Sequence, residues 1–258
     1  MLKSSPLLNK KVLVPRGENQ AKSFSQLVKT YGGIPVEIPL IAFRPIEGNQ
    51  RLQDSLKALD TYDWIIFTSN VTVETFFSVH EDRKSLPKIA VIGKKTAEGL
   101  AERGLEAEFV PSAFVAESFV EEFLPLVRPG VKILIPKGSL ARDYIAASLS
   151  DAGAIVDEVV IYETYMPESS RDRLAKMFSE KMLDILLFTS PSTVDHFMGV
   201  VNDFGFSKKI SEYLIGCIGP VTEKKLLSYG LKVHISPKEY TVEDMIKSTI
   251  TYLEREEL

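Results

Sequence analysis

The chain has 258 residues, a length that fits two domains of ordinary size or one large domain. Hydrophobic residues make up 45% of the chain and charged residues 26%, which is the composition of a globular protein. The net charge of −4 gives no indication of a nucleic-acid partner, and the single cysteine, Cys217, excludes an intrachain disulfide. The three histidines lie far apart without the spacing of metal ligands, so we expect no metal site.

The N-terminal residues 1–11 lack the long apolar segment and the small-residue cleavage site of a secretion signal. No apolar run in the sequence approaches the roughly 18 residues that a membrane-spanning helix needs. We therefore expect a cytoplasmic protein without a membrane partner.

Short apolar segments alternate with helical patterns in chain order. Residues 12–14 predict a strand, and Phe24, Leu27, Val28 and Tyr31 follow with the i, i+3, i+4, i+7 spacing of an amphipathic helix. Further strands of the first half are expected at residues 34–38, 64–67, 89–92 and 107–110. Strands that alternate with helices of this length indicate an α/β fold, with parallel sheets covered by helices on both faces.

The second half of the chain repeats the first. A shift of 121 residues carries Phe67 onto Phe188 and residues 12–16 onto 133–137. Beyond residue 92 the shift becomes 126, so that Gly93 corresponds to Gly219, because the second copy has gained about five residues near 200–206. The repeat predicts two similar flavodoxin-like domains, and a cleft between such domains is a common place for small molecules to bind.

Residues 37–43 and 158–166 interrupt the alternation and correspond to each other in the repeat. Both segments are apolar and contain the β-branched and aromatic residues that are typical of strands, with prolines nearby. Each segment fits either a linker strand between the two domains or an ordinary strand of a sheet. The pattern alone leaves both interpretations open.

Polar residues lie directly after several predicted strands, where open α/β sheets bind their ligands. Ser69 and Ser190 lie there, and Pro191 marks the first turn of a helix, so both serines are expected to be helix N-caps. Helix N-termini attract anions, and residues 93–96 and 219–222 form two further turns of this kind. The four turns together favour a site for a polyanion, although serines at such positions can also serve only as caps.

Two cations occupy equivalent places immediately after predicted strands. Arg16 follows the first strand, and the repeat puts Lys137, with Gly138 and Ser139 after it, at the corresponding turn of the second half. A cation and backbone N–H groups at such a turn suit an anionic ligand, but charged side chains are also common on solvated surfaces. The patterns GxxxxGK[ST] and GxGxxG do not occur, so nucleotide binding has no support.

Taken together, these segments resemble uroporphyrinogen-III synthase over nearly the whole chain, from Val12 to about Met245. Six short motifs carry the resemblance, in this order: Val12–Arg16, Phe67–Asn70, Ile92–Ala97, Ile161–Thr164, Phe188–Ser192 and Ile218–Thr222. Where many members of the family read Thr-Arg-Pro at the first strand end, this chain reads Pro-Arg-Gly and keeps the cation.

The resemblance implies two α/β domains joined by a two-stranded antiparallel ladder. Domain one would consist of residues 1–38 plus 167–258 and domain two of residues 44–160, with residues 37–43 and 158–166 as the linker strands. The N-terminal strand and helix would therefore belong with the C-terminal half of the chain.

The resemblance also implies a reaction. The substrate would be hydroxymethylbilane, a linear tetrapyrrole with eight carboxylates, which loses water, inverts its terminal D ring through a spiro intermediate and closes to uroporphyrinogen III. Without an enzyme this substrate closes spontaneously to the symmetrical isomer. No cofactor or metal is implied. The expected partners are the substrate and, transiently, the preceding deaminase that hands it over to a monomeric enzyme.

The resemblance assigns one catalytic residue and a group of binding residues. Tyr162 is the candidate proton donor to the leaving hydroxyl, since a phenol is protonated at neutral pH. In the repeat Tyr162 corresponds to Ile41, so a ladder strand does not require this hydroxyl, although packing of an aromatic ring is the alternative role. The expected substrate-binding residues are Arg16, Ser69, Asn70, Thr96, Lys137, Gly138, Ser139, Ser190, Pro191 and Thr222.

Two other functions fit parts of the pattern. A non-catalytic two-domain binder of a small polyanionic ligand would keep the strand-end turns but would not need Tyr162. A purely structural pair of flavodoxin-like units would explain the repeat but not the polar turns. A test of whether the chain converts hydroxymethylbilane discriminates among these interpretations.

Overall fold

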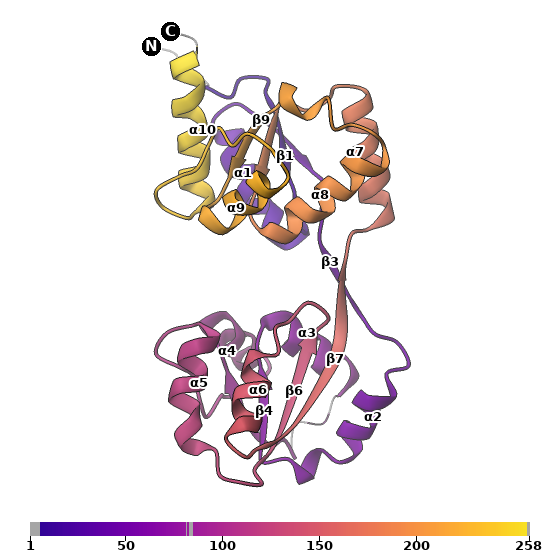
Figure 1. Ribbon diagram of the computed structural model, residues 1–258, viewed down its shortest axis with the longest axis vertical. Helices are drawn as coiled ribbons and strands as arrows, with labels where there is room; N and C mark the ends of the chain where they lie inside the picture. The colour runs from indigo at the N-terminus through magenta and orange to yellow at the C-terminus, as the bar shows by residue number, and fades with distance from the viewer. Residues whose placement is uncertain (1–5, 81, 83–84, 257–258) are drawn as a thin grey trace. The chain divides into compact units, whose positions relative to one another are not determined.

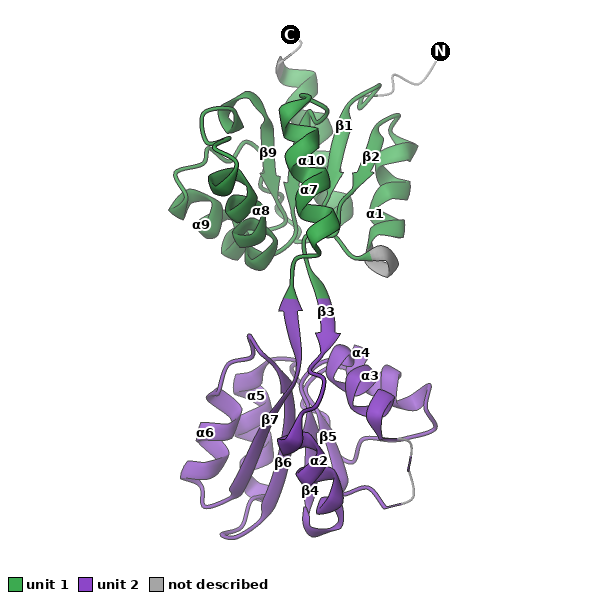
Figure 2. Ribbon diagram, turned by 90° about the vertical axis from the view of Figure 1, so that its right-hand side faces the viewer, with its two compact units in different colours: residues 1–42, 165–258 green, residues 43–164 purple. Residues whose placement is uncertain are grey.

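The computed structural model describes residues 6–80, 82 and 85–256 of the chain (Figure 1). The described residues form two compact units, of which unit 1 takes its residues from Met1–Ala42 and Tyr165–Leu258 and unit 2 from Phe43–Thr164 (Figure 2). Within these residues, every helix is too short or too polar to span a bilayer.

Unit 1 is a four-stranded parallel sheet with helices on both faces. The strand order is β2-β1-β8-β9, and the strands are β1 (Lys11–Val14), β2 (Ile34–Glu37), β8 (Ile185–Phe188) and β9 (Leu214–Cys217). The helices are α1 (Glu18–Thr30), α7 (Glu168–Ser179), α8 (Pro191–Asp203), α9 (Pro220–Ser228) and α10 (Val242–Glu256), with a short 3-10 turn at Ile210–Glu212.

Successive residues of the unit 1 strands enter two separate cores. Leu13 and Phe188 pack with side chains of α7, α8 and α9, whereas Val12 and Leu187 pack with α1 and α10. This alternation explains why β8 reads as an unbroken apolar run, because both of its faces are covered.

Unit 2 has the same plan with an added strand. Its order is β3-β7-β6-β4-β5, and the strands are β3 (Ala42–Pro45), β4 (Trp64–Phe67), β5 (Lys88–Val91), β6 (Lys132–Gly138) and β7 (Ile155–Tyr165). The helices are α2 (Gln50–Lys57), α3 (Asn70–Val79), α4 (Lys94–Ala101), α5 (Ala116–Phe123) and α6 (Tyr144–Asp151), with 3-10 turns at Leu59–Thr61 and Leu124–Leu126. Ile65 and Phe67 pack with α3 and α4, and Trp64 and Ile66 pack with α5 and α6.

The strand pairing of the two units is related by the sequence repeat. Val12 of β1 pairs with Ile185 of β8, and Ile133 of β6 pairs with Trp64 of β4. The shift of 121 residues carries Val12 onto Ile133 and Trp64 onto Ile185, so the two pairs are equivalent. In each unit a strand from one half of the chain thus lies beside a strand from the other half. The internal duplication is thus visible in the strand pairing, and β1 from the N-terminal half of the chain lies beside β8 from the C-terminal half within unit 1.

The chain passes from one unit to the other along two strands. In Figure 2, β3 and the last part of β7 run side by side in opposite directions, and the N–H of Ile46 donates to the carbonyl oxygen of Ile161 at 3.0 Å. The first part of β7 pairs in parallel with β6. One long strand therefore fills both roles that the sequence left open for residues 158–166.

The other linker strand is displaced along the chain. We expected it at residues 37–43, but the strand occupies Ala42–Pro45. Ile38 and Leu40 are fully buried in the core of unit 1 that faces α7, and the N–H of Ile38 donates to the carbonyl oxygen of Val14 at 3.1 Å. The apolar residues of this segment therefore anchor the chain in unit 1 before the ladder begins.

Candidate active site

Tyr162 lies on β7 beside the carboxyl ends of β6 and β4. Its side chain is 8% exposed, and its Oη lies 3.4 Å from Oγ of Ser69. The ring of Phe43 contacts the Tyr162 ring edge-on, with the centroids 5.5 Å apart. The phenol is therefore held among an apolar ring, the backbone of β6 and one hydroxyl.

Ser69 is the N-cap of α3, as the sequence predicts. Its Oγ accepts a hydrogen bond from the backbone N–H of Thr72 at 3.2 Å and lies 2.8 Å from the Thr72 hydroxyl oxygen. Ser139 approaches from the next strand, where its N–H donates to the carbonyl oxygen of Tyr162 at 3.0 Å. The edge of this sheet thus brings Ser69, Ser139 and Tyr162 together.

Asn70 follows the cap and is tightly packed. Its Nδ2 donates to Oε1 of Glu74 at 2.7 Å, and its Oδ1 is buried without a hydrogen-bond partner among the residues that the structure describes. A Cβ added to Gly99 of α4 would lie 1.8 Å from this oxygen. Such an unpaired buried acceptor is uncommon in folded proteins and marks a place where a donor would be stabilising.

A cavity of about 520 Å³ lies at the N-terminus of α4, beside the end of β5. It is lined by Gly93, Lys94, Lys95, Thr96, Glu98 and Phe114. Thr96 itself is buried, whereas Lys94, Lys95 and Phe114 are exposed. Phe114 is not among the site residues expected from the sequence. The repeat relates it to Tyr240 by the shift of 126, and the two rings lie beside equivalent glycines, Gly93 and Gly219.

In unit 1 the equivalent strand ends carry Arg16 and Thr189. Nε of Arg16, just after β1, donates to Oγ1 of Thr189, just after β8, at 3.0 Å. Burial lowers the pKa of the Arg16 guanidinium from its ordinary value, yet arginine stays charged at neutral pH. No carboxylate of the described residues forms an ion pair with Arg16.

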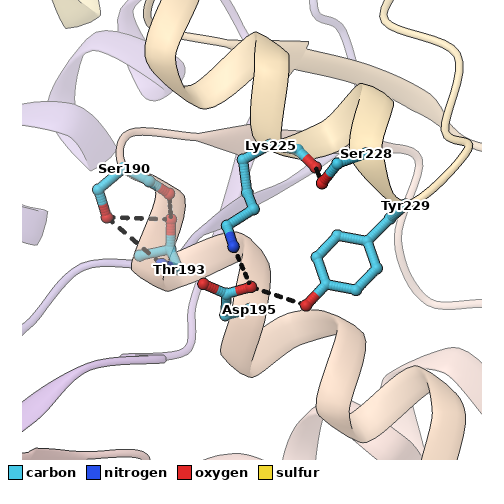
Figure 3. Close-up of polar contacts among 6 residues, drawn as sticks. All are labelled: Ser190, Thr193, Asp195, Lys225, Ser228 and Tyr229. Carbon is cyan, nitrogen blue, oxygen red and sulfur yellow. Dashed lines mark hydrogen bonds and ion pairs between the residues drawn. The ribbon is translucent and has the colours of Figure 1, made fainter.

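Ser190 caps α8 as Ser69 caps α3. Its Oγ accepts a hydrogen bond from the N–H of Thr193 at 3.3 Å (Figure 3). Pro191 fills the first helical position. Thr222, in the first turn of α9, is buried. Both N-cap predictions are confirmed, and both copies of the fold use the same local device to begin the helix.

An ionic cluster ties α8 to α9 one turn beyond the Ser190 cap. Asp195 accepts from Nζ of Lys225 at 2.9 Å and from Oη of Tyr229 at 2.7 Å (Figure 3). Burial alone would raise the pKa of the Asp195 carboxyl, but the two hydrogen bonds hold this pKa below its ordinary value. The cluster stabilises the relative placement of the helices that carry Ser190 and Thr222.

Lys137 does not share the environment of Arg16, its equivalent in the repeat. The Lys137 side chain is 10% exposed, and its Nζ contacts Oδ1 of Asp143 at 2.5 Å and Oε1 of Glu158 at 2.8 Å. Two carboxylates thus already neutralise the ammonium group. This arrangement gives Lys137 a structural role in unit 2, and its role in binding substrate stays a prediction.

Lys137→Met is expected to lower the free energy of unfolding by about 1–3 kcal/mol, since Glu158 loses its ammonium partner. Burial alone would lower the pKa of Lys137, but its two carboxylate partners raise that pKa. Its stabilisation is therefore complete below the ordinary lysine pKa of 10.5 and is lost as the pH rises through the higher folded-state pKa. Denaturant titrations of wild type and variant should converge above that pH.

Lys57→Met is the control for this prediction, because Lys57 forms only an exposed pair with Asp54. Its effect on stability should be within about 0.5 kcal/mol. If Lys137→Met keeps the wild-type stability but raises KM, Lys137 binds substrate and does not stabilise unit 2.

The fold defines a class of protein: a two-unit α/β protein with parallel sheets, in which polar side chains and helix N-caps follow the carboxyl ends of the strands. The family model described as "Uroporphyrinogen-III synthase HemD" matches residues 22–247. The chain belongs to the uroporphyrinogen-III synthase family.

Individual relatives agree with the family model. The chain is 30% identical to uroporphyrinogen-III synthase of Synechococcus elongatus, over 93% of this chain and 94% of the relative. It is 31% identical to uroporphyrinogen-III synthase of Chlorobaculum parvum, over 90% and 94% of the two chains.

Solved structures share the fold. A mutant uroporphyrinogen III synthase of Thermus thermophilus superimposes with a TM-score of 0.63 at 18% identity, over 95% of this chain and 99% of that one. The Helicobacter pylori uroporphyrinogen-III synthetase gives a TM-score of 0.62 at 16% identity, with the same coverage. At these identities the likeness concerns the fold alone.

Proposed function

We propose that the protein is a uroporphyrinogen-III synthase, a cyclising lyase of tetrapyrrole biosynthesis. It converts linear hydroxymethylbilane into uroporphyrinogen III through loss of water, inversion of the D ring and closure of the macrocycle. The observation that carries the proposal is the family match over residues 22–247. The buried phenol of Tyr162 beside Ser69 supports it with chemistry that the reaction needs.

Substrate binding depends on groups that attract carboxylates. Arg16 supplies a positive charge, and the N-terminal turns of α3 and α8 supply backbone N–H groups and the positive ends of helix dipoles. Similar contacts before and during the reaction would hold the flexible substrate in one conformation. The binding residues of this proposal are Arg16, Ser69, Asn70, Thr96, Lys137, Gly138, Ser139, Ser190, Pro191 and Thr222.

Tyr162 acts as the general acid. When the C–O bond of the hydroxymethyl group breaks, the electron pair leaves with the oxygen, and the Tyr162 proton converts the leaving group into water. The Ser69 hydroxyl, 3.4 Å away, can donate to the phenolate that forms. The proton that a ring carbon releases at closure restores the phenol, so the overall change is loss of one water.

The product isomer tests the proposed function. Purified protein mixed with fresh hydroxymethylbilane should give mainly the type III isomer after oxidation and chromatographic separation of the porphyrins. Spontaneous closure in a protein-free control gives the symmetrical isomer. A product mixture identical to the control would reject the synthase and favour a non-catalytic binder of polyanions.

The cellular setting of this activity follows from the reactivity of the substrate. We propose a cytoplasmic monomer that receives hydroxymethylbilane by transient hand-over from the deaminase that makes it. Spontaneous closure of the free substrate supports this proposal, because a short interval between the two enzymes limits formation of the symmetrical isomer.

A further inference from the structure

The Tyr162 ring lies directly against the α-carbon of Gly138, the last residue of β6. A Cβ added to Gly138 would lie 2.4 Å from Cζ, 2.5 Å from Cε2 and 2.6 Å from Oη of Tyr162. Carbon atoms that are not bonded pack at about 3.5–4.0 Å. Any side chain at residue 138 would therefore force the phenol to move.

The backbone of Gly138 does not itself require glycine. Gly138 is not among the residues with positive φ, so its backbone conformation is open to alanine. The pairing register between β6 and β7 shifts between Lys137 and Gly138, and this irregularity brings Tyr162 opposite Gly138. The hydrogen bond from the N–H of Ser139 to the carbonyl oxygen of Tyr162 fixes the two strands in this register.

We propose that Gly138 is a positioning residue that sets the place of the Tyr162 hydroxyl for proton transfer. The absent Cβ lets the ring lie close to the backbone of Gly138, the Phe43 ring contacts it at 89° between the ring planes, and Ser69 lies at the hydroxyl. This inference rests on the proposed role of Tyr162 as the proton donor. Besides the proposed place of its backbone in the binding site, it assigns to Gly138 a role through its lack of a side chain.

The repeat supplies a matched control. Gly17 corresponds to Gly138, and Ile41 corresponds to Tyr162, both by the shift of 121. Among the described residues, a Cβ on Gly17 would meet only the carbonyl oxygen of Ile41, at 4.0 Å. Alanine fits at residue 17, the N-cap of α1, but not at residue 138, the last residue of β6, although the two glycines are equivalent in the repeat.

Gly138→Ala is expected to lower kcat at least tenfold with little change in KM, because a displacement of about 1 Å at a reacting group can cost on the order of 100-fold. Gly17→Ala should leave both constants within about twofold of wild type. In a Tyr162→Phe background, Gly138→Ala should have no further effect on kcat, since the hydroxyl that it displaces is already absent.

Thermal unfolding gives a second, activity-independent readout. Gly138→Ala should lower the Tm of the wild-type protein by about 2 °C or more. In a Tyr162→Leu background, where the ring is absent, Gly138→Ala should not lower the Tm further. This comparison decides whether the added Cβ and the ring compete for space even if Gly138→Ala is too unstable for kinetics. Additive Tm losses would overturn the inference.

Different results would contradict the positioning role of Gly138 and the donor role of Tyr162. Equal losses of kcat from Gly138→Ala in wild-type and Tyr162→Phe backgrounds would overturn the positioning role while leaving Tyr162 as the donor. An unchanged kcat in Tyr162→Phe itself would remove the donor role and the positioning role that rests on it. The Tm comparison would then still report whether the ring packs on Gly138.

Discussion

Tyr162→Phe is expected to lower kcat by about 10²–10⁴-fold, the contribution of a well-placed general acid. This loss corresponds to about 3–5 kcal/mol of activation free energy. The ring should keep its place, because Gly138 and Phe43 contact the ring rather than depend on the hydroxyl. KM and thermal stability should therefore stay near the wild-type values in steady-state assays and unfolding scans.

Tyr144→Phe is the control for this experiment, because Tyr144 is an exposed tyrosine on α6 of the same unit. It should change kcat by less than about twofold. If Tyr162→Phe costs less than about tenfold in kcat, water or another group delivers the proton, and Tyr162 serves only as packing.

Arg16→Ala is expected to raise KM by about 10–100-fold while kcat changes little. Loss of a hydrogen bond to a charged group costs about 1.5–3 kcal/mol, and this contact is similar in the ground and transition states. KM should also depend less strongly on salt concentration, because the variant lacks the attraction between Arg16 and the substrate carboxylates that dissolved ions screen. Initial rates across a salt series measure both effects.

Arg128→Ala, at an exposed position after α5, controls for the loss of any one positive charge. The two variants carry the same net charge, so a difference between their KM values must come from a local contact of Arg16 with the substrate. Equal KM values and equal salt slopes for both variants would make Arg16 a surface charge without a role in binding.

The fold was largely predictable because its signals are local. β4 and β8 occupy residues 64–67 and 185–188, and both are wholly apolar since helices cover both faces of each sheet. The same shifts that align the sequence relate the strand pairings, including the isolated bridges Ala90↔Phe109 and Gly216↔Ile235. The strand expected at 107–110 is reduced to the first of these bridges.

The position of the first linker strand was less predictable. Ile38 and Leu40 read as strand residues in the sequence, yet they fill the unit 1 core beside α7 without pairing in the ladder. Apolar residues in an extended segment give the same pattern in both situations. Only the tertiary contacts decide where the core ends and the ladder starts.

The fate of the two equivalent cations could not be predicted from the repeat. Glu158 pairs with Lys137, but its equivalent Glu37 accepts a hydrogen bond from Ser25 instead of pairing with Arg16. Asp143, the second partner of Lys137, comes from a loop before α6. Side-chain partners such as these depend on the folded geometry, as does the contact between Gly138 and Tyr162.

The most direct test of the account is the isomer distribution formed by wild type and Tyr162→Phe from the same preparation of hydroxymethylbilane. Wild type is expected to give predominantly uroporphyrinogen III. The reaction with the variant should yield mostly the symmetrical isomer, because spontaneous closure of the substrate is faster than the slowed enzymatic reaction. Predominant type III product from both proteins at equal rates would contradict the role of Tyr162, and the symmetrical isomer from both would contradict the synthase itself.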